Sequence, residues 1–121
     1  MGRIIHEVKI SSGLNAEEFI ILDAMVDTGA SVMTLPESYK NRFTQLSMQE
    51  AECVTANAIV KVLVGGPFKI SLTGFRSIFS EVAFLPGLDE PLIGYTVLEA
   101  IPAAVDMLGH RLVPIKYLDM K

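Results

Sequence analysis

The sequence predicts an all-β fold, a small barrel or sandwich that carries one or two short helices. Two observations support it: turn signals recur roughly every ten residues, and the segments between them are apolar and partly alternating. The chain has 121 residues, which is the size of one domain. Because no linker, tandem repeat or low-complexity segment interrupts the pattern, residues 1–121 are expected to form a single domain.

Glycine and proline delimit the expected strands. Residues 13–17 suit a hairpin connection, Gly65-Gly66-Pro67 is expected to end one strand, and Pro86-Gly87 another. The strands expected between such signals cover residues 3–10, 18–26, 30–35, 52–64 with an interruption at 56–58, 68–72, 77–85, and a final hairpin of 103–107 and 111–117.

Two short helices complete the expected fold. Pro36 suits the first helical position and Glu37 the first turn, which favours a helix over residues 36–43. A second helix is expected over residues 95–100, ended by Pro102.

The composition carries more apolar side chains than a small domain readily buries. Half of the residues are hydrophobic, and a chain of this length keeps a large fraction of its surface exposed. We therefore expect part of the excess to line a cleft or a subunit interface. A tightly packed β-protein rich in Val and Ile explains the same composition, and the two interpretations are compatible.

Charge and cysteine content argue against several classes of function. The net charge is −4, and the Lys and Arg residues are scattered, so we expect no nucleic-acid partner. Cys53 is the single cysteine, which rules out an intramolecular disulfide and a cysteine metal cluster. The charged start and the short apolar runs predict neither a secretory signal nor a membrane partner. A cytoplasmic location is the expectation that follows.

The segment Ala24–Ser31 (AMVDTGAS) is the strongest candidate for chemistry. Asp27 directly follows an apolar strand, Gly29 allows a sharp turn and a close approach to the carboxylate, and Thr28 offers a hydroxyl that can fix the loop. A carboxylate on a rigid, dry loop has the position that a general acid or base needs. An ordinary turn is the alternative, since Asp, Thr and Gly all form turns. The tetrapeptide itself arises by chance in roughly one chain in a hundred.

A second motif, later in the chain, makes the first more specific. Two apolar residues and a glycine, Leu92-Ile93-Gly94, stand directly before the expected helix 95–100. In this order, Asp27-Thr28-Gly29-Ala30 followed by Leu92-Ile93-Gly94 resembles the retroviral-type (retropepsin-like) aspartic proteases, in particular their small single-domain relatives in bacteria and archaea. The residues 86–99 and the closing segments Val105-Asp106 and Arg111-Leu112-Val113 are also similar to that family, so the resemblance covers nearly the whole chain.

The resemblance implies a closed retropepsin-type β-barrel and an aspartic endopeptidase. A chain with one Asp-Thr-Gly loop must obtain the second from another copy, so it implies a homodimer with an isologous interface. Asp27 and its symmetry mate would then activate a water for hydrolysis of a peptide or protein substrate. Thr28 would hydrogen-bond to the partner loop, with Gly29 and Ala30 supporting the turn. Neither a metal nor another cofactor is implied.

The family also covers its cleft with a mobile hairpin flap that has glycine near its tip. The matching residues here are Ala56, Asn57 and Ala58, where that glycine is missing, although Asn tolerates a left-handed turn. The departure keeps an alternative open: a catalytically weak or inactive dimer that binds peptides or acts as a scaffold. Retroviral relatives interleave their termini, which points to residues 4–10 and 112–118 as interface strands.

Overall fold

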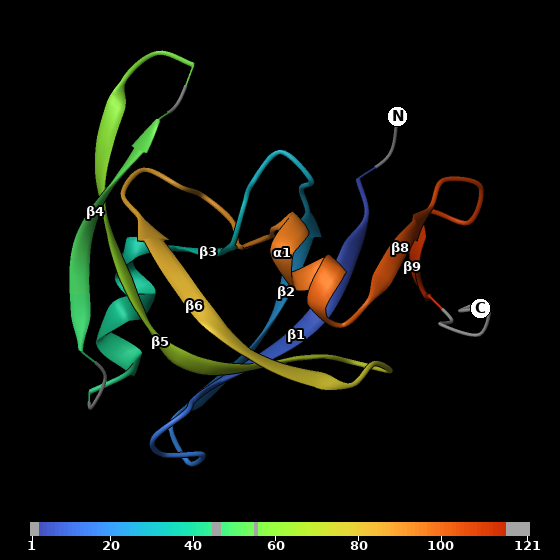
Figure 1. Ribbon diagram of the computed structural model, residues 1–121, viewed down its shortest axis with the longest axis horizontal. Helices are drawn as coiled ribbons and strands as arrows, with labels where there is room; N and C mark the ends of the chain where they lie inside the picture. Colours follow the sequence, from blue (N-terminus) through green and yellow to red (C-terminus); the bar gives the residue numbers. More distant parts are fainter. Residues whose placement is uncertain (1–2, 45–46, 55, 116–121) are drawn as a thin grey trace, which may run out of the picture.

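The computed structural model describes residues 3–44, 47–54 and 56–115, and within them the protein is an all-β structure with two short helices (Figure 1). The strands are β1 (Ile5–Ser12), β2 (Phe19–Val26), β3 (Met33–Pro36), β4 (Met48–Val54), β5 (Ile59–Leu72), β6 (Ser77–Leu85), β7 (Leu92–Ile93), β8 (Ala103–Asp106) and β9 (Arg111–Pro114). The helices are the 3-10 helix η1 (Glu37–Arg42) and the α-helix α1 (Tyr95–Ala100).

Seven of the strands form one sheet, in the order β1-β2-β7-β3-β6-β5-β4, while β8 and β9 form a separate hairpin. An additional pairing joins β5 to β1, so the succession of pairings that leaves β1 through β2 returns to it through β5. From Val8 to Ser11, β1 pairs with β2 and β5 simultaneously. This stretch of the expected interface strand is therefore used within its own chain.

The long strand β5 corrects one expectation. Gly65-Gly66-Pro67 was expected to separate two strands, but β5 continues through these residues from Ile59 to Leu72. The pairing with β6 shifts register between Gly65 and Phe68, and the strand changes its second partner there, from β4 to β1. Glycine and proline mark an irregularity in a bent strand here, as they do at bulges.

The core lies inside this curved sheet. Phe68 packs edge-on against Phe43, with ring centroids 4.9 Å apart, and also contacts Phe84. Helix α1 contributes the buried side chains of Val97 and Leu98. The largest fully buried side chains come from five strands and from α1 with its C-cap: Val8, Ile10, Met33, Leu35, Phe68, Ile70, Leu72, Val82, Phe84, Ile93, Val97 and Ile101.

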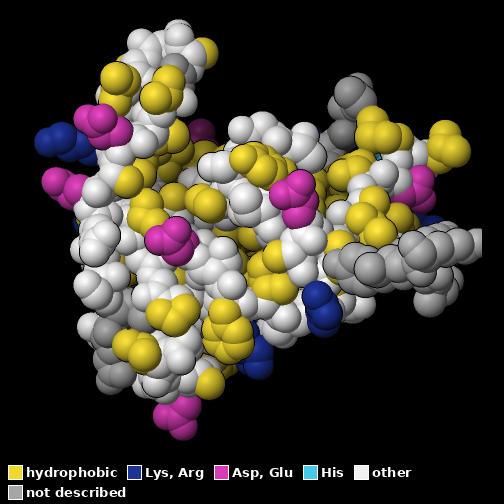
Figure 2. All heavy atoms as spheres, in the orientation of Figure 1, with side chains coloured by type: hydrophobic (Ala, Val, Ile, Leu, Met, Phe, Trp, Pro, Cys, Tyr) yellow, Lys and Arg dark blue, Asp and Glu magenta, His cyan; other side chains and the backbone are white. Residues whose placement is uncertain are grey.

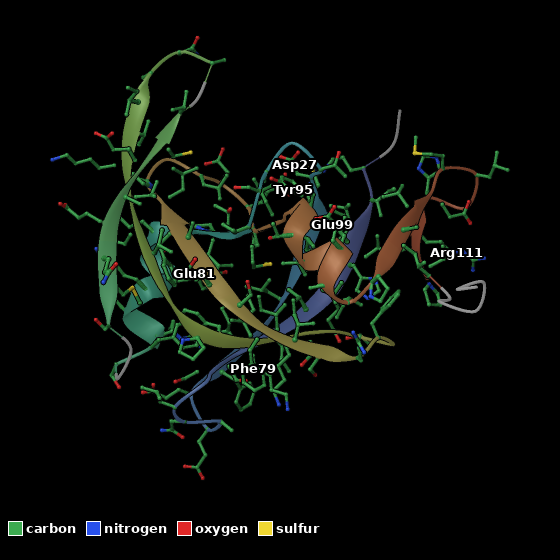
Figure 3. The ribbon with its side chains drawn as sticks, in the orientation of Figure 1. Asp27, Phe79, Glu81, Tyr95, Glu99 and Arg111 are labelled. Carbon is green, nitrogen blue, oxygen red and sulfur yellow. The ribbon has the colours of Figure 1, made fainter. Side chains whose placement is uncertain are left out.

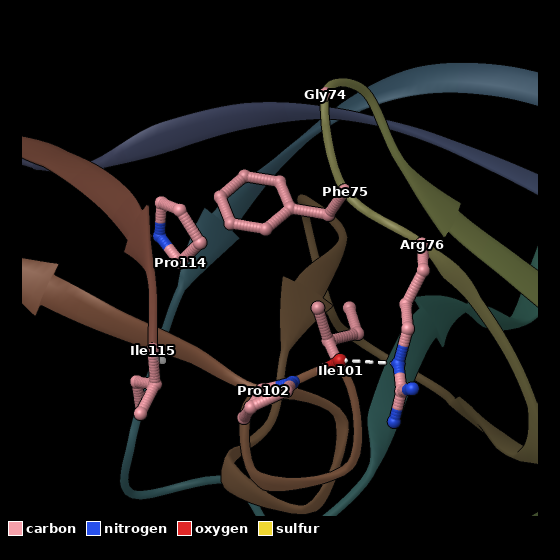
Figure 4. Close-up of a pocket in the computed structure, with 7 residues that line it drawn as sticks. All are labelled: Gly74, Phe75, Arg76, Ile101, Pro102, Pro114 and Ile115. Atoms are coloured by element: carbon pink, nitrogen blue, oxygen red, sulfur yellow. Dashed lines mark hydrogen bonds between the residues drawn. The ribbon is translucent and has the colours of Figure 1, made fainter. Parts of the chain in front are cut away.

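An arginine holds the end of α1. The Arg76 guanidinium donates hydrogen bonds from Nε to the carbonyl oxygen of Ile101 (2.6 Å) and from Nη2 to that of Ala100 (3.3 Å). Figure 4 shows this contact at the edge of a cavity of about 310 Å³, lined by Phe75, Pro102 and neighbouring residues. A cation is favourable at this position because the last carbonyls of a helix have no partner within the helix.

The other elements follow the sequence, except that β4 begins at Met48 and not at residue 52. The helix expected over 95–100 is α1, and the one expected over 36–43 is the shorter η1. The strand expected at 30–35 begins only at Met33, because the preceding residues belong to a loop. Residues 116–117 of the expected final hairpin, and residues 116–118 of the expected interface strand, lie outside the described residues. No helix in the described ranges is long and apolar enough to cross a membrane.

Candidate functional site

Asp27 begins the loop that leaves β2, directly after the strand's last residue. The carboxylate Oδ1 of Asp27 accepts a hydrogen bond from the Gly29 amide at 2.9 Å, and the Ala30 amide donates to the Asp27 carbonyl at 3.1 Å. A Cβ at Gly29 would lie 3.2 Å from the same Oδ1, which is why this position suits glycine. Asp27 is half-buried, whereas Thr28 and Gly29 are exposed. The turn therefore orients the carboxylate and leaves its neighbours uncovered.

The second motif lies against this loop. Strand β7 sits between β2 and β3, parallel to the former (Val26↔Ile93) and antiparallel to the latter (Thr34↔Leu92). The Asp27 amide donates to the Ile93 carbonyl at 3.0 Å. The two sequence-predicted motifs are thus neighbours in space, joined through the backbone of the candidate catalytic residue.

Gly94 and the start of α1 hold the far end of the loop. A Cβ at Gly94 would lie 2.4 Å from the Val32 carbonyl oxygen and 2.7 Å from its amide nitrogen, so only glycine permits this approach. Beyond it, the Tyr95 amide donates to the Ala30 carbonyl at 2.9 Å, and the Thr96 amide and hydroxyl both donate to the Ser31 carbonyl. These contacts fix the loop through backbone groups, which sequence changes on its surface do not alter.

A cavity of about 590 Å³ opens beside the loop. It lies between the Asp27 loop, the β4–β5 hairpin and β6, and Figure 2 shows hydrophobic side chains in the hollow between that hairpin and α1. Asp27 itself is not among the lining residues. These are Gly29, Ala30, Ser31, Val32, Thr34, Ala51, Glu52, Cys53, Val54, Val62, Val64, Glu81, Ala83, Leu85, Leu92 and Tyr95.

The β4–β5 hairpin stands beside this cavity and has an exposed apolar end. Its last paired residues, Val54 and Ile59, are 80% and 64% exposed. The candidate flap residues 56–58 lie in the connection between the two strands, as expected. Among the described residues only His110 is a non-glycine residue with a positive φ, so Asn57 does not adopt the left-handed backbone that it could tolerate.

A second, smaller hollow lies on the other side of the loop. It measures about 380 Å³ and is lined by Thr28, by Met25 and Val26 of β2, and by Val105 and Met107 of the terminal hairpin, with Arg3 and Ile4. Thr28 therefore faces a mostly apolar surface. Its hydroxyl has no hydrogen-bond partner among the described residues.

Sequence reasoning did not single out most of the residues that line the cavity, among them Glu81, Ala83 and Tyr95. Alternation along residues 77–85 places Glu81, Ala83 and Leu85 on one strand face, but only the topology tells that this face borders the Asp27 loop. No group of three or more His, Cys, Asp or Glu side chains that could hold a metal ion occurs within the described ranges.

Comparison with known proteins adds no relative. No family model matches the chain, and no curated protein matches it.

Proposed function

We propose that the protein is an aspartic endopeptidase of the retropepsin-like family, active as a homodimer. The observation that carries the proposal is the junction of the two motifs, where Asp27 bonds through its amide to Ile93 and Gly94 packs on the backbone of Val32. An isolated Asp-Thr-Gly turn needs no such support. The pairings that lead from β1 back to β1 favour the closed barrel that this family implies.

The need for a second copy follows from the single loop. Acid–base hydrolysis by a carboxyl pair needs two carboxyl groups in contact, and the chain has one Asp-Thr-Gly segment. In Figure 1 the Asp27 loop, the tip of the β4–β5 hairpin and the β8–β9 turn all project toward one edge of the molecule. Val54, Ile59, Met107 and Leu108 are exposed in these segments, and a twofold partner on this edge would cover apolar surface.

In such a dimer the two Asp27 carboxyl groups share one proton, because like charges at hydrogen-bond distance cannot both ionise. The ionised group takes a proton from a water, whose oxygen attacks the peptide carbonyl carbon. The protonated group donates its proton to the carbonyl oxygen. Collapse of the resulting diol breaks the C–N bond, and the amine leaves with a proton from the pair.

The cavity beside the loop is the proposed site of the peptide. Among the described strands, β4 pairs only with β5, so its second edge is open along the cavity. An extended peptide can add to such an edge as a further strand, with its side chains alternating into pockets. The backbone would thereby pass between β4 and the Asp27 loop.

Cleavage of a mixed peptide pool from acid to neutral pH tests the proposal. We expect the wild type to cleave and Asp27→Asn to lose at least about a thousandfold in kcat/KM, since the pair can no longer exchange its proton. Asp23→Asn, an equal change at an exposed residue of β2, should retain activity. Equal cleavage by the wild type and Asp27→Asn, or a monomer by sedimentation at micromolar concentration, would refute the mechanism.

A catalytically weak peptide-binding or scaffolding dimer is the second candidate. It is favoured by the hairpin connection Ala56-Asn57-Ala58, which lacks the glycine of the family's flap. Peptide binding without hydrolysis by the wild-type dimer would support it over the protease.

A further inference from the structure

The cavity beside the Asp27 loop has an apolar wall and an acidic mouth. Val62 and Val64 of β5 and Ala83 and Leu85 of β6 supply apolar wall residues. Glu81 precedes Ala83 by two positions on β6, so its side chain leaves the same face of the strand. It lines the cavity and is exposed, so its carboxylate lies at the opening; Figure 3 labels the side chain.

No positively charged side chain in the described part of the chain forms an ion pair with Glu81. Its carboxylate makes no hydrogen bond or ion pair with any described residue, and no Lys, Arg or His lines the cavity. The second acidic lining residue, Glu52 of β4, makes no ion pair with a described residue either, but it stands directly across from Lys61 of β5. Opposite charges at such cross-strand positions attract each other. Glu81 has no basic residue beside it in the cavity lining, so its carboxylate is the more available of the two to a cationic ligand.

We propose that Glu81 selects a lysine or arginine side chain of the bound peptide. Such side chains bury an aliphatic stem against apolar surface and keep the charged end at its edge, which matches a wall of Val, Ala and Leu with a carboxylate at the mouth. The inference rests on the proposed function, because it assigns a substrate class, basic peptides, to the same cleft.

The size of the preference follows from the exposure of Glu81. Solvent-exposed ion pairs contribute modestly, so a peptide with Lys should bind about two- to fivefold more tightly than one with norleucine, which has a similar stem without charge. A Glu peptide should bind more weakly than both. Added salt should reduce the Lys preference, because exposed charges are screened.

The test uses three peptides that differ only in Lys, norleucine or Glu at one position, scanned along the sequence. Each is made in a cleavable form and in a form with a reduced, uncleavable bond. Cleavage is followed by mass spectrometry and binding by fluorescence anisotropy, with the full-length protein. Glu81→Gln should abolish the Lys preference, and Glu81→Lys should turn it into a Glu preference. Glu99→Gln, the same change at an exposed residue of α1 outside the cavity, should leave it unchanged.

The two proposals fail in different ways. Lys preference in binding of the uncleavable peptides, without cleavage of the others, would support the Glu81 inference and refute the protease. Cleavage with no Lys preference, or a Lys preference that survives in Glu81→Gln, would overturn the inference and leave the protease standing. Absence of any peptide binding would overturn both.

Discussion

Replacement of Gly94 by alanine is the sharpest test of how the two motifs meet. Gly94 has φ −82° and ψ 168°, an extended backbone that alanine adopts without strain. The added methyl group would nevertheless lie 2.4 Å from the Val32 carbonyl oxygen and 2.7 Å from both the carbonyl carbon and the amide nitrogen. All three are backbone atoms, so no side-chain rotation relieves the overlap, and the segments must separate.

The cost can be worked from these contacts. Overpacking a tight site destabilises by about 1–3 kcal/mol. Separation also weakens hydrogen bonds that cross the junction, such as the one from the Tyr95 amide to Ala30 (2.9 Å), each contributing about 1 kcal/mol. We expect Gly94→Ala to lower the free energy of unfolding by about 3 kcal/mol, a large share of the roughly 5–15 kcal/mol typical of a domain.

Urea unfolding measures this difference. The chain has no Trp, so unfolding is followed by far-ultraviolet circular dichroism. Gly66→Ala is the matched control, since a Cβ there would meet only ordinary contacts of 3.4 Å or more. Peptide cleavage by Gly94→Ala should also be slower, because the Asp27 loop is less ordered in this variant. A Gly94→Ala protein whose unfolding free energy lies within about 0.5 kcal/mol of the control's would show that the close approach does not exist in solution.

Three further predictions concern association, helix capping and pH. Thr28→Ala should raise the dimer dissociation constant about tenfold, since two symmetry-related hydroxyl hydrogen bonds are lost, and it should leave the monomer's thermal unfolding unchanged. Sedimentation at several concentrations measures the dissociation constant, and an unaltered value would exclude a Thr28 hydrogen bond between the two copies. Arg76→Met should destabilise by about 1–2 kcal/mol, because the carbonyls at the end of α1 lose a charged donor; urea unfolding beside Lys69→Met checks it, and equal stability of the two variants would contradict it. The Gly109 amide, with further donors, holds the pKa of the Asp106 carboxyl below its ordinary value of 3.8. The ionised carboxylate therefore stabilises the turn at pH values above 3.8, and this stabilisation is lost as the pH falls through the lowered pKa. Asp106→Asn should therefore be less stable than the wild type at pH 7 and approach it near pH 2, and a gap that persists in acid would refute this assignment.

Local signals in the sequence predicted the elements that carry the candidate site. The loop after residues 24–26 and the helix 95–100 both stand where their patterns placed them. Each depends on neighbouring residues: an apolar strand that ends at a carboxylate and glycine, and a short helical stretch stopped before Pro102. Their meeting in space was not predicted, since hydrophobic periodicity does not encode which strands pair.

Long-range pairing is also what sequence reasoning could not supply. Gly65-Gly66-Pro67 has the composition of a turn, yet β5 passes through it because β6 supports both halves of the strand. The sequence did not predict a role for Glu81, because it is one charged residue in an alternating strand. Its position at the cavity depends on β6 lying between β3 and β5, a contact made by segments far apart in the chain.

The Asp27 loop makes its backbone hydrogen bonds within the chain, and its Thr28 side chain is left for a second copy of the proposed dimer. Backbone groups of Asp27, Ala30 and Ser31 bond within the chain to Ile93, Tyr95 and Thr96, whereas the exposed Thr28 hydroxyl has no partner in the described residues. Because the backbone contacts do not depend on a second copy, the loop can be ordered in a monomer before association. A dimer of the proposed kind would then complete only the side-chain contacts and the carboxyl pair. Folding and activation are therefore separable steps, and protein concentration should control the second without changing the first.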